Sequence, residues 1–141
     1  MKIRTVLLTL LYLVIFPGME SCSDSTPNYT ITENRNVPAC GISDPLYNIE
    51  WIKEFCKKHT STDFTSVTVS ISIYANKTTK ENHYVMSYSS SEVVDYSSQE
   101  VYDCSGTKLF IKSIEGPTPA GWNEFFTANE LVATIWEFKK N

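Results

Sequence analysis

The sequence has few of the residues that build catalytic, metal or nucleic-acid sites. Its 141 residues include only two histidines, His59 and His83, and neither lies in a metal-binding or nucleophilic motif. It also lacks a glycine-rich phosphate loop and a cluster of lysines and arginines. With 12 basic and 16 acidic residues the chain is mildly acidic, so it cannot build the positive surface that a phosphate backbone requires. We therefore expect no nucleic-acid partner, no cofactor, no metal and no enzymatic activity.

Long apolar runs are also scarce, and the only one stands at the start, over residues 6–16 behind two basic residues. It is too short to span a membrane as a mature helix and is typical of a secretory signal. Cys22 follows Ser21 at the spacing at which lipoprotein signal peptidase cuts, although Glu20 departs from the usual apolar or small residue. We expect a signal peptide over 1–21 and lipid on Cys22. Ordinary cleavage near Ser21, which would leave Cys22 as a spare thiol, is the alternative.

The segment behind the signal, residues 22–39, is rich in Ser, Thr, Asn and Pro and has few large apolar side chains. It can bury too little to offset the entropy of ordering it, so we expect a flexible tether. Residues 40–141 then form a single domain, a length that suits one modest core. The expected location is the cell envelope. Lipid would attach the chain to a bacterial membrane, with the outer membrane favoured, and the domain would lie in the periplasm or at the cell surface.

Two periodicities occur within this domain. From Pro45 to Lys58 apolar residues recur at helical spacing, behind an Asp44-Pro45 start. From Val67 to Tyr74 apolar and polar residues alternate, which predicts a half-buried strand. Further strand-like runs follow at Tyr84 to Tyr88, Glu100 to Asp103, Lys108 to Ile114 and Leu131 to Phe138. We therefore predict an α+β fold, with one N-terminal amphipathic helix packed on a small antiparallel sheet of about four to five strands.

Short motifs in a fixed order carry a family resemblance. They are Ser21-Cys22-Ser23-Asp24, then Cys40 with Asp44-Pro45-Leu46 and Trp51-Ile52-Lys53-Glu54, and last Val101-Tyr102-Asp103-Cys104-Ser105-Gly106. In these motifs the chain resembles a group of small, functionally uncharacterised lipoproteins from Bacteroidetes. The resemblance implies an envelope location and a small α+β domain, and it implies no activity.

Three cysteines remain once Cys22 is lipidated, in a compartment that permits disulfides. Cys56 continues the apolar stripe of the predicted helix, so it should face the core. Cys40 precedes the helix and Cys104 lies at a bend between two strands, where the backbone can adjust to disulfide geometry. We hypothesise a disulfide between Cys40 and Cys104, and a pair between Cys56 and Cys104 is the alternative.

Several tyrosines fall on predicted strands, among them Tyr84, Tyr88 and Tyr102. On the outer face of a sheet such flat amphipathic rings would form a platform for a sugar ring or a peptide. Alternatively, they pack in the core or pair across strands. The favoured function is a non-catalytic binding or interaction module of the envelope, which contacts an envelope protein or a glycan through the sheet face or the last edge strand.

Two other functions fit less well. An envelope hydrolase would need a site assembled from distant strands, for which His83, Glu100 and Asp103 are the candidates. A secreted eukaryotic domain would use the glycosylation sequons at Asn28 and Asn76.

Overall fold

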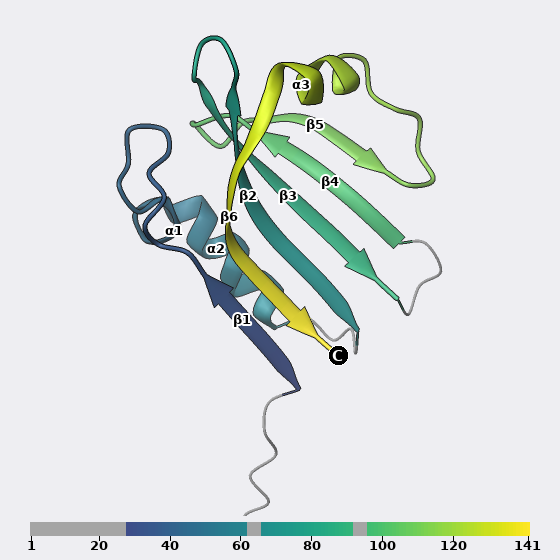
Figure 1. Cartoon of the computed structure of the whole chain (residues 1–141). Coiled ribbons are helices and arrows are strands. Elements are labelled where there is room, and N and C mark those ends of the chain that lie inside the picture. Colours follow the sequence, from purple (N-terminus) through teal and green to yellow (C-terminus); the bar gives the residue numbers. More distant parts are fainter. Residues whose placement is uncertain (1–27, 62–65, 92–95) are drawn as a thin grey trace, which may run out of the picture.

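A six-stranded antiparallel sheet dominates the computed structural model, which describes residues 28–61, 66–91 and 96–141. Strand accounts for 48% of it and helix for 21%. The strands are β1 (Tyr29–Glu33), β2 (Val67–Asn76), β3 (Asn82–Ser90), β4 (Tyr96–Tyr102), β5 (Lys108–Ser113) and β6 (Asn129–Lys140), and the helices are α1 (Pro45–Asn48), α2 (Glu50–Thr60) and α3 (Trp122–Ala128). The strand order is β1-β6-β2-β3-β4-β5 (Figure 1). In the described ranges, no helix is both long enough and apolar enough to cross a membrane.

The expected fold class is wrong in its balance of sheet and helix. The sheet has six strands rather than four to five, and among the described residues two short helices, α1 and α2, stand in place of the single N-terminal helix. The segment expected to form that helix is broken at Ile49, whose backbone is extended at φ −107° and ψ 114°. The Ile49 N–H donates to the carbonyl of Pro45, and its own carbonyl accepts from the N–H of Ile52. Asparagine and β-branched isoleucine are weak helix formers, which accounts for a break at Asn48 and Ile49.

The segment expected to be a flexible tether contributes a strand to the sheet. Cys22 and the expected signal lie outside the described residues, but residues 29–33 form β1 and pair antiparallel with β6. Ala39 is 2% exposed in the core. All five residues of β1 are exposed, although Tyr29 and Ile31 alternate with Thr30 and Thr32 as in a strand. Hydrogen bonding to the free edge of β6 supplies the stabilisation that side-chain burial does not.

One face of the sheet forms the main core, beneath α1 and α2, which lie behind the sheet in Figure 1. Alternate residues of β2 are buried along its whole length, as its apolar alternation predicts. Cross-strand partners from β3 and β6 share this face, since paired residues in an antiparallel ladder point the same way. The central members are Leu46, Ile49, Ile52, Val69, Ile71, Ile73, Tyr84, Met86, Trp136 and Phe138.

A second, smaller core lies on the opposite face under α3. It contains Val85, Val101, Trp122 and Phe125, with Tyr74, Phe110 and Phe126 packed against it. Lys77 holds the end of α3, because its Nζ donates to the carbonyl of Thr127 at 2.7 Å and its backbone N–H donates to the carbonyl of Ala128 at 2.9 Å. This helix covers only one end of that face, at the top of Figure 1.

A disulfide joins Cys40 to Cys104, the pairing that we hypothesised from the sequence. The two Cα atoms are 5.5 Å apart and the residues are separated by 64 positions, so the bond ties the loop before α1 to the turn between β4 and β5. The Cys40 N–H also donates to the side-chain oxygen of Asn82 at 3.0 Å. Among the described cysteines Cys56 is free, and burial raises the pKa of its thiol to about 12. Cys56 therefore behaves as a small apolar group against the core.

Candidate binding surface

The tyrosines expected to form an exposed platform are covered by α2. Tyr84 is fully buried, and Tyr88 and Tyr102 are half-buried on the same face. Trp51 lies with its ring centroid 5.5 Å from that of Tyr84 and 5.3 Å from that of Tyr102, while Phe55 contacts Tyr88. The platform expectation is therefore wrong. The burial of Tyr84 and Tyr88 could have been predicted from the sequence, because both alternate in phase with apolar Met86.

The residues considered for a hydrolase do not meet. His83 contacts Phe125 on the α3 side of the sheet, with the ring centroids 5.1 Å apart. Glu100 lies on the α2 side, where Lys108 donates to it at 2.9 Å. Asp103 lies in the turn after β4, where hydrogen bonds from its neighbours in the turn lower the pKa of its carboxyl. The sheet itself separates the imidazole from Glu100, so the three do not form a catalytic group.

Both sequon asparagines use their side chains in hydrogen bonds within the protein. Asn28 donates to the carbonyl of Asn141, and Asn76 accepts from the backbone N–H groups of Thr78 and Thr79 at 2.9 and 3.0 Å.

In the described part of the chain, no group of three or more His, Cys, Asp and Glu side chains could hold a metal ion.

On the α3 side, the part of the sheet that no other described element covers is a flat polar surface. Its strand register aligns one residue from each of the six strands in a straight row across the sheet. We call this the polar row, and it runs Thr32, Glu137, Ser70, Ser87, Gln99 and Lys112. A parallel row beside it, running Thr30, Lys139, Thr68, Ser89 and Ser97, is similar. Short hydroxyl side chains therefore form this face on β2 and β3, with the charges of Glu137 and Lys139 beside them on β6 and that of Lys112 on β5.

Contacts within the sheet orient the groups of the polar row. The Gln99 side-chain amide donates to the hydroxyl of Ser87 at 3.2 Å. The Lys112 ammonium lies 5.6 Å from the ring centroid of Trp122, which is 5% exposed and therefore fixed in position. A cavity of about 200 Å³ opens at this end of the row, between β4 and β5. Its lining residues are Ser97, Ser98, Gln99, Lys112, Ser113 and Ile114.

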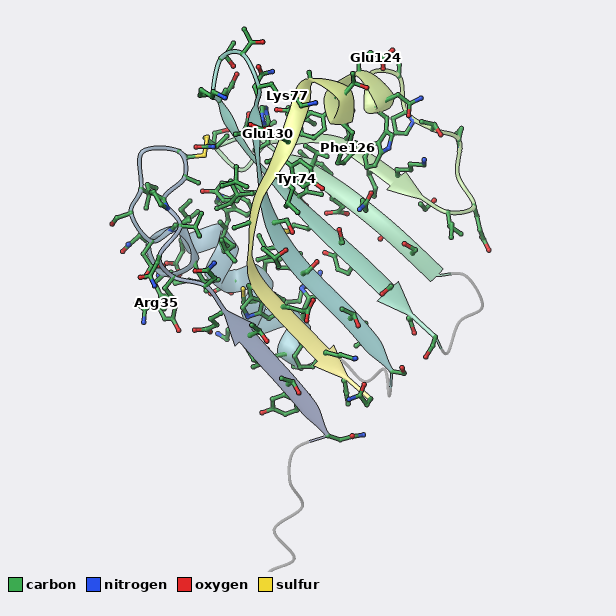
Figure 2. All side chains as sticks on the ribbon, viewed as in Figure 1. Arg35, Tyr74, Lys77, Glu124, Phe126 and Glu130 are labelled. Atoms are coloured by element: carbon green, nitrogen blue, oxygen red, sulfur yellow. A yellow bond between two sulfur atoms is a disulfide. The ribbon has the colours of Figure 1, made fainter. Side chains whose placement is uncertain are left out.

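Aromatic residues border the same face where α3 begins to cover it. Tyr74 and Phe126 meet edge to face, with their ring centroids 5.4 Å apart, and both are half-buried (Figure 2). Leu131, which pairs with Tyr74 across β2 and β6, is 55% exposed. The surface thus consists of the flat polar row and an apolar border formed by Tyr74, Phe126 and Leu131.

No protein-family model, curated protein or solved structure matches this chain. The candidate surface is therefore interpreted from its own chemistry. Its hydroxyl and amide groups can each donate and accept hydrogen bonds without changing protonation state. Such groups can hold a polar ligand in a fixed orientation.

Sequence reasoning missed this surface although its residues are visible in the strand patterns. The serines and threonines at 68, 70, 72, 87 and 89 occupy every second position, opposite to the apolar phase. This alternation predicts that they lie on one face of the sheet. Their alignment across the sheet depends on the register of β6 and β1, which the local pattern does not contain.

Proposed function

We propose that this protein is a non-catalytic binding module of the cell envelope that holds a neutral, hydroxyl-rich glycan on the polar row. The observation that carries the proposal is the row itself, in which hydroxyl and amide groups extend across the middle of an uncovered sheet. Sugar hydroxyls also both donate and accept, so a glycan can satisfy the hydroxyl and amide groups of the row.

A glycan fits this surface better than a protein partner does. Protein interfaces gain most of their energy from a few aromatic or other large residues buried near the centre. The polar row and the row beside it contain none, and their centre is serine, threonine and glutamine. The apolar face of a sugar ring needs only a local hydrophobic contact, which Tyr74 and Phe126 provide at the border.

The lipid anchor on Cys22 is part of the same proposal, as is attachment to a bacterial membrane. Six residues separate Cys22 from the start of β1 at Tyr29, a span of at most about 25 Å when fully extended. A domain anchored in this way stays close to the bilayer. Its ligand would then be a glycan of the envelope or one that reaches the membrane surface.

Affinity electrophoresis tests the proposal. Native protein is run in gels that contain a neutral soluble polysaccharide, with dextran, mannan and a β-glucan as the probes. We expect at least one of them to retard the wild-type protein. A variant that combines Ser87→Ala with Gln99→Ala should need about tenfold more of that polysaccharide for the same retardation.

The control is Ser43→Ala combined with Lys57→Ala, which removes exposed polar groups from the loop before α1 and from α2. It should be retarded like the wild type. The proposal is contradicted if no neutral polysaccharide retards the protein, or if the Ser87 and Gln99 variant binds as well as the control.

A further inference from the structure

The two edges of the sheet differ in how well they are protected against pairing with another strand. β5, at one edge, carries Lys108 and Lys112, and its ladder to β4 has a register shift between Val101 and Tyr102. Lysines and bulges at an edge strand both hinder the addition of a further strand. β1, at the other edge, contains neither lysine nor proline, and it pairs with β6 in one continuous register. The β1 edge therefore lacks these protections.

The free side of β1 presents backbone groups that point away from the sheet. The N–H of Asn34, just after β1, donates to the carbonyl of Ile135 in β6 at 2.8 Å. Because the direction of these bonds alternates along an antiparallel strand, the even-numbered residues of β1 bond to β6. The N–H and C=O groups of Tyr29, Ile31 and Glu33 therefore point outward, where no described strand pairs with them (Figure 1).

The side chains of this edge also suit a strand partner. Tyr29 is 45% exposed and Ile31 is 41% exposed, although both lie on the α2 face beside buried Phe138. Thr30 and Thr32 lie on the opposite face, where they end the two rows of hydroxyl groups. Aromatic and β-branched side chains favour pairing across strands. An added strand would cover the exposed parts of Tyr29 and Ile31.

We propose that a second copy of this chain pairs with β1, antiparallel and about a two-fold axis at Ile31, so that two six-stranded sheets become one. In the register of full overlap, Ile31 faces the partner's Ile31, Thr30 faces the partner's Thr32, and Tyr29 faces the partner's Glu33. The outward residues of the two strands then face one another, and each such pair exchanges two backbone hydrogen bonds. The contact is closed by its own symmetry.

β1 is complementary to itself in this register. Glu33 is its only charged residue, and the two-fold axis places Glu33 across from an uncharged tyrosine rather than from another carboxylate. Isoleucine meets isoleucine and threonine meets threonine, which are favourable cross-strand pairs. Because Ile31 is the middle residue of the strand and also points outward, full overlap and complete backbone pairing occur together. These matches favour a second copy as the occupant of the edge.

The dimer would also join the hydroxyl rows of the two copies. Thr32 ends the polar row and Thr30 ends the row beside it, and the pairing places Thr32 across from the partner's Thr30. Both copies present these rows on the same side, because the axis is perpendicular to the sheet. A glycan longer than one row would then continue onto the second copy. This consequence rests on the proposed function, whereas the dimer itself does not.

The test measures the molar mass of the full chain in mild detergent by light scattering over a dilution series. We expect the wild type to reach twice the chain mass of 16.0 kDa. Ile31→Lys places two like charges at the axis, and Ile31→Pro removes an N–H that the ladder to β6 does not use, so both should keep the mass of one chain. Ile111→Lys, at an exposed position of β5, is the matched control and should dimerise like the wild type.

A disulfide trap tests the register and stands even if lysine or proline at position 31 disturbs the fold. Ile31→Cys, oxidised with copper phenanthroline, should give a product of doubled mass on a non-reducing gel, because the two Cα atoms of such a pair lie about 5.5 Å apart. Tyr29→Cys is the control on the same edge. The two copies of that position would lie four residues apart along the strands, about 13 Å, which no disulfide spans.

The proposal is overturned if the wild type keeps the mass of one chain at every concentration, which would leave the edge to a strand of another protein. It is also overturned if both Ile31 variants dimerise, if Ile111→Lys does not, or if Tyr29→Cys crosslinks as readily as Ile31→Cys. A doubled mass without retardation by any polysaccharide would contradict the proposed function and leave the dimer standing.

Discussion

Replacing Gly106 with alanine tests the contact between the Trp51 indole of α2 and the turn between β4 and β5. Gly106 has φ +85°, and an added Cβ would lie 2.8 Å from Trp51 Nε1 and 3.0 Å from Trp51 Cδ1. The indole cannot easily withdraw, because it is stacked on Tyr102 and meets Tyr84 edge to face. Alanine at this position therefore suffers both from backbone strain and from a clash.

The two costs can be separated with a second glycine. A left-handed backbone costs a residue with a Cβ about 1 to 2 kcal/mol, and overpacking against a fixed side chain costs about 1 to 3 kcal/mol. Gly41 has φ +75°, and among the described residues nothing lies within 4 Å of its added Cβ. Gly41→Ala should thus cost about 1 to 2 kcal/mol and Gly106→Ala about 2 to 5 kcal/mol.

The assay is urea unfolding followed by tryptophan fluorescence, with the free energy of unfolding compared among wild type and both variants. A double variant with Trp51→Ala is the decisive control, because the extra cost of alanine at Gly106 should disappear once the indole is absent. If both glycine variants lose the same free energy within about 0.5 kcal/mol, the indole does not close on Gly106 and the reasoning fails.

Four other predictions use the same domain. Ile52 is fully buried, so Ile52→Ala should cost about 2 to 5 kcal/mol in urea unfolding, and a loss below about 0.5 kcal/mol would contradict its place in the core. Replacing both Cys40 and Cys104 with alanine opens a loop of 64 residues and should cost about 4 kcal/mol, measured against the oxidised wild type. The folded-state pKa of Asp103 is lowered from its ordinary value of 3.8, so its stabilisation is present above that pH and is lost as the pH falls further. The difference in unfolding free energy between wild type and Asp103→Asn should therefore shrink below pH 3.8, and a constant difference would contradict this. Cys22→Ala should move the protein from the membrane fraction to the soluble envelope fraction, whereas a variant that still sediments with membranes after a salt wash would show that lipid on Cys22 is not the anchor.

Local patterns predicted the parts of the fold that depend on near neighbours in sequence. The alternation from Val67 to Tyr74 is buried on one face, as expected of a half-buried strand. It pairs with β3, the next strand along the chain, through a short turn. The Cys40 and Cys104 pairing followed from placing Cys56 on the core stripe of a helix, a local argument that the structure supports.

The parts that failed depend on contacts between distant residues. β1 alternates Tyr29 and Ile31 with threonines, but all five of its residues are exposed at an edge, and the ladder that pairs it with β6 joins residues more than 100 positions apart. β6 lies between β1 and β2, so the two ends of the described chain pair with each other at one edge of the sheet. Trp122, Phe125 and Phe126 do occur at helical spacing, but a helix of seven residues does not reveal from its sequence which face of a sheet it covers.

Folding constrains the composition of the two faces of the sheet unequally. This difference bears on the proposed role of the polar row. The α2 face must bury large apolar residues to form a core, so its composition is set by stability. The uncovered face needs only to remain polar, and lysine or glutamate would meet that need while adding solubility. At Ser70 and Ser87 the chain instead carries short hydroxyls at the centre of the sheet, with Gln99 bonded to Ser87 beside them. Stability does not require that choice, whereas the proposed glycan, lying flat on the sheet, would bond to those groups.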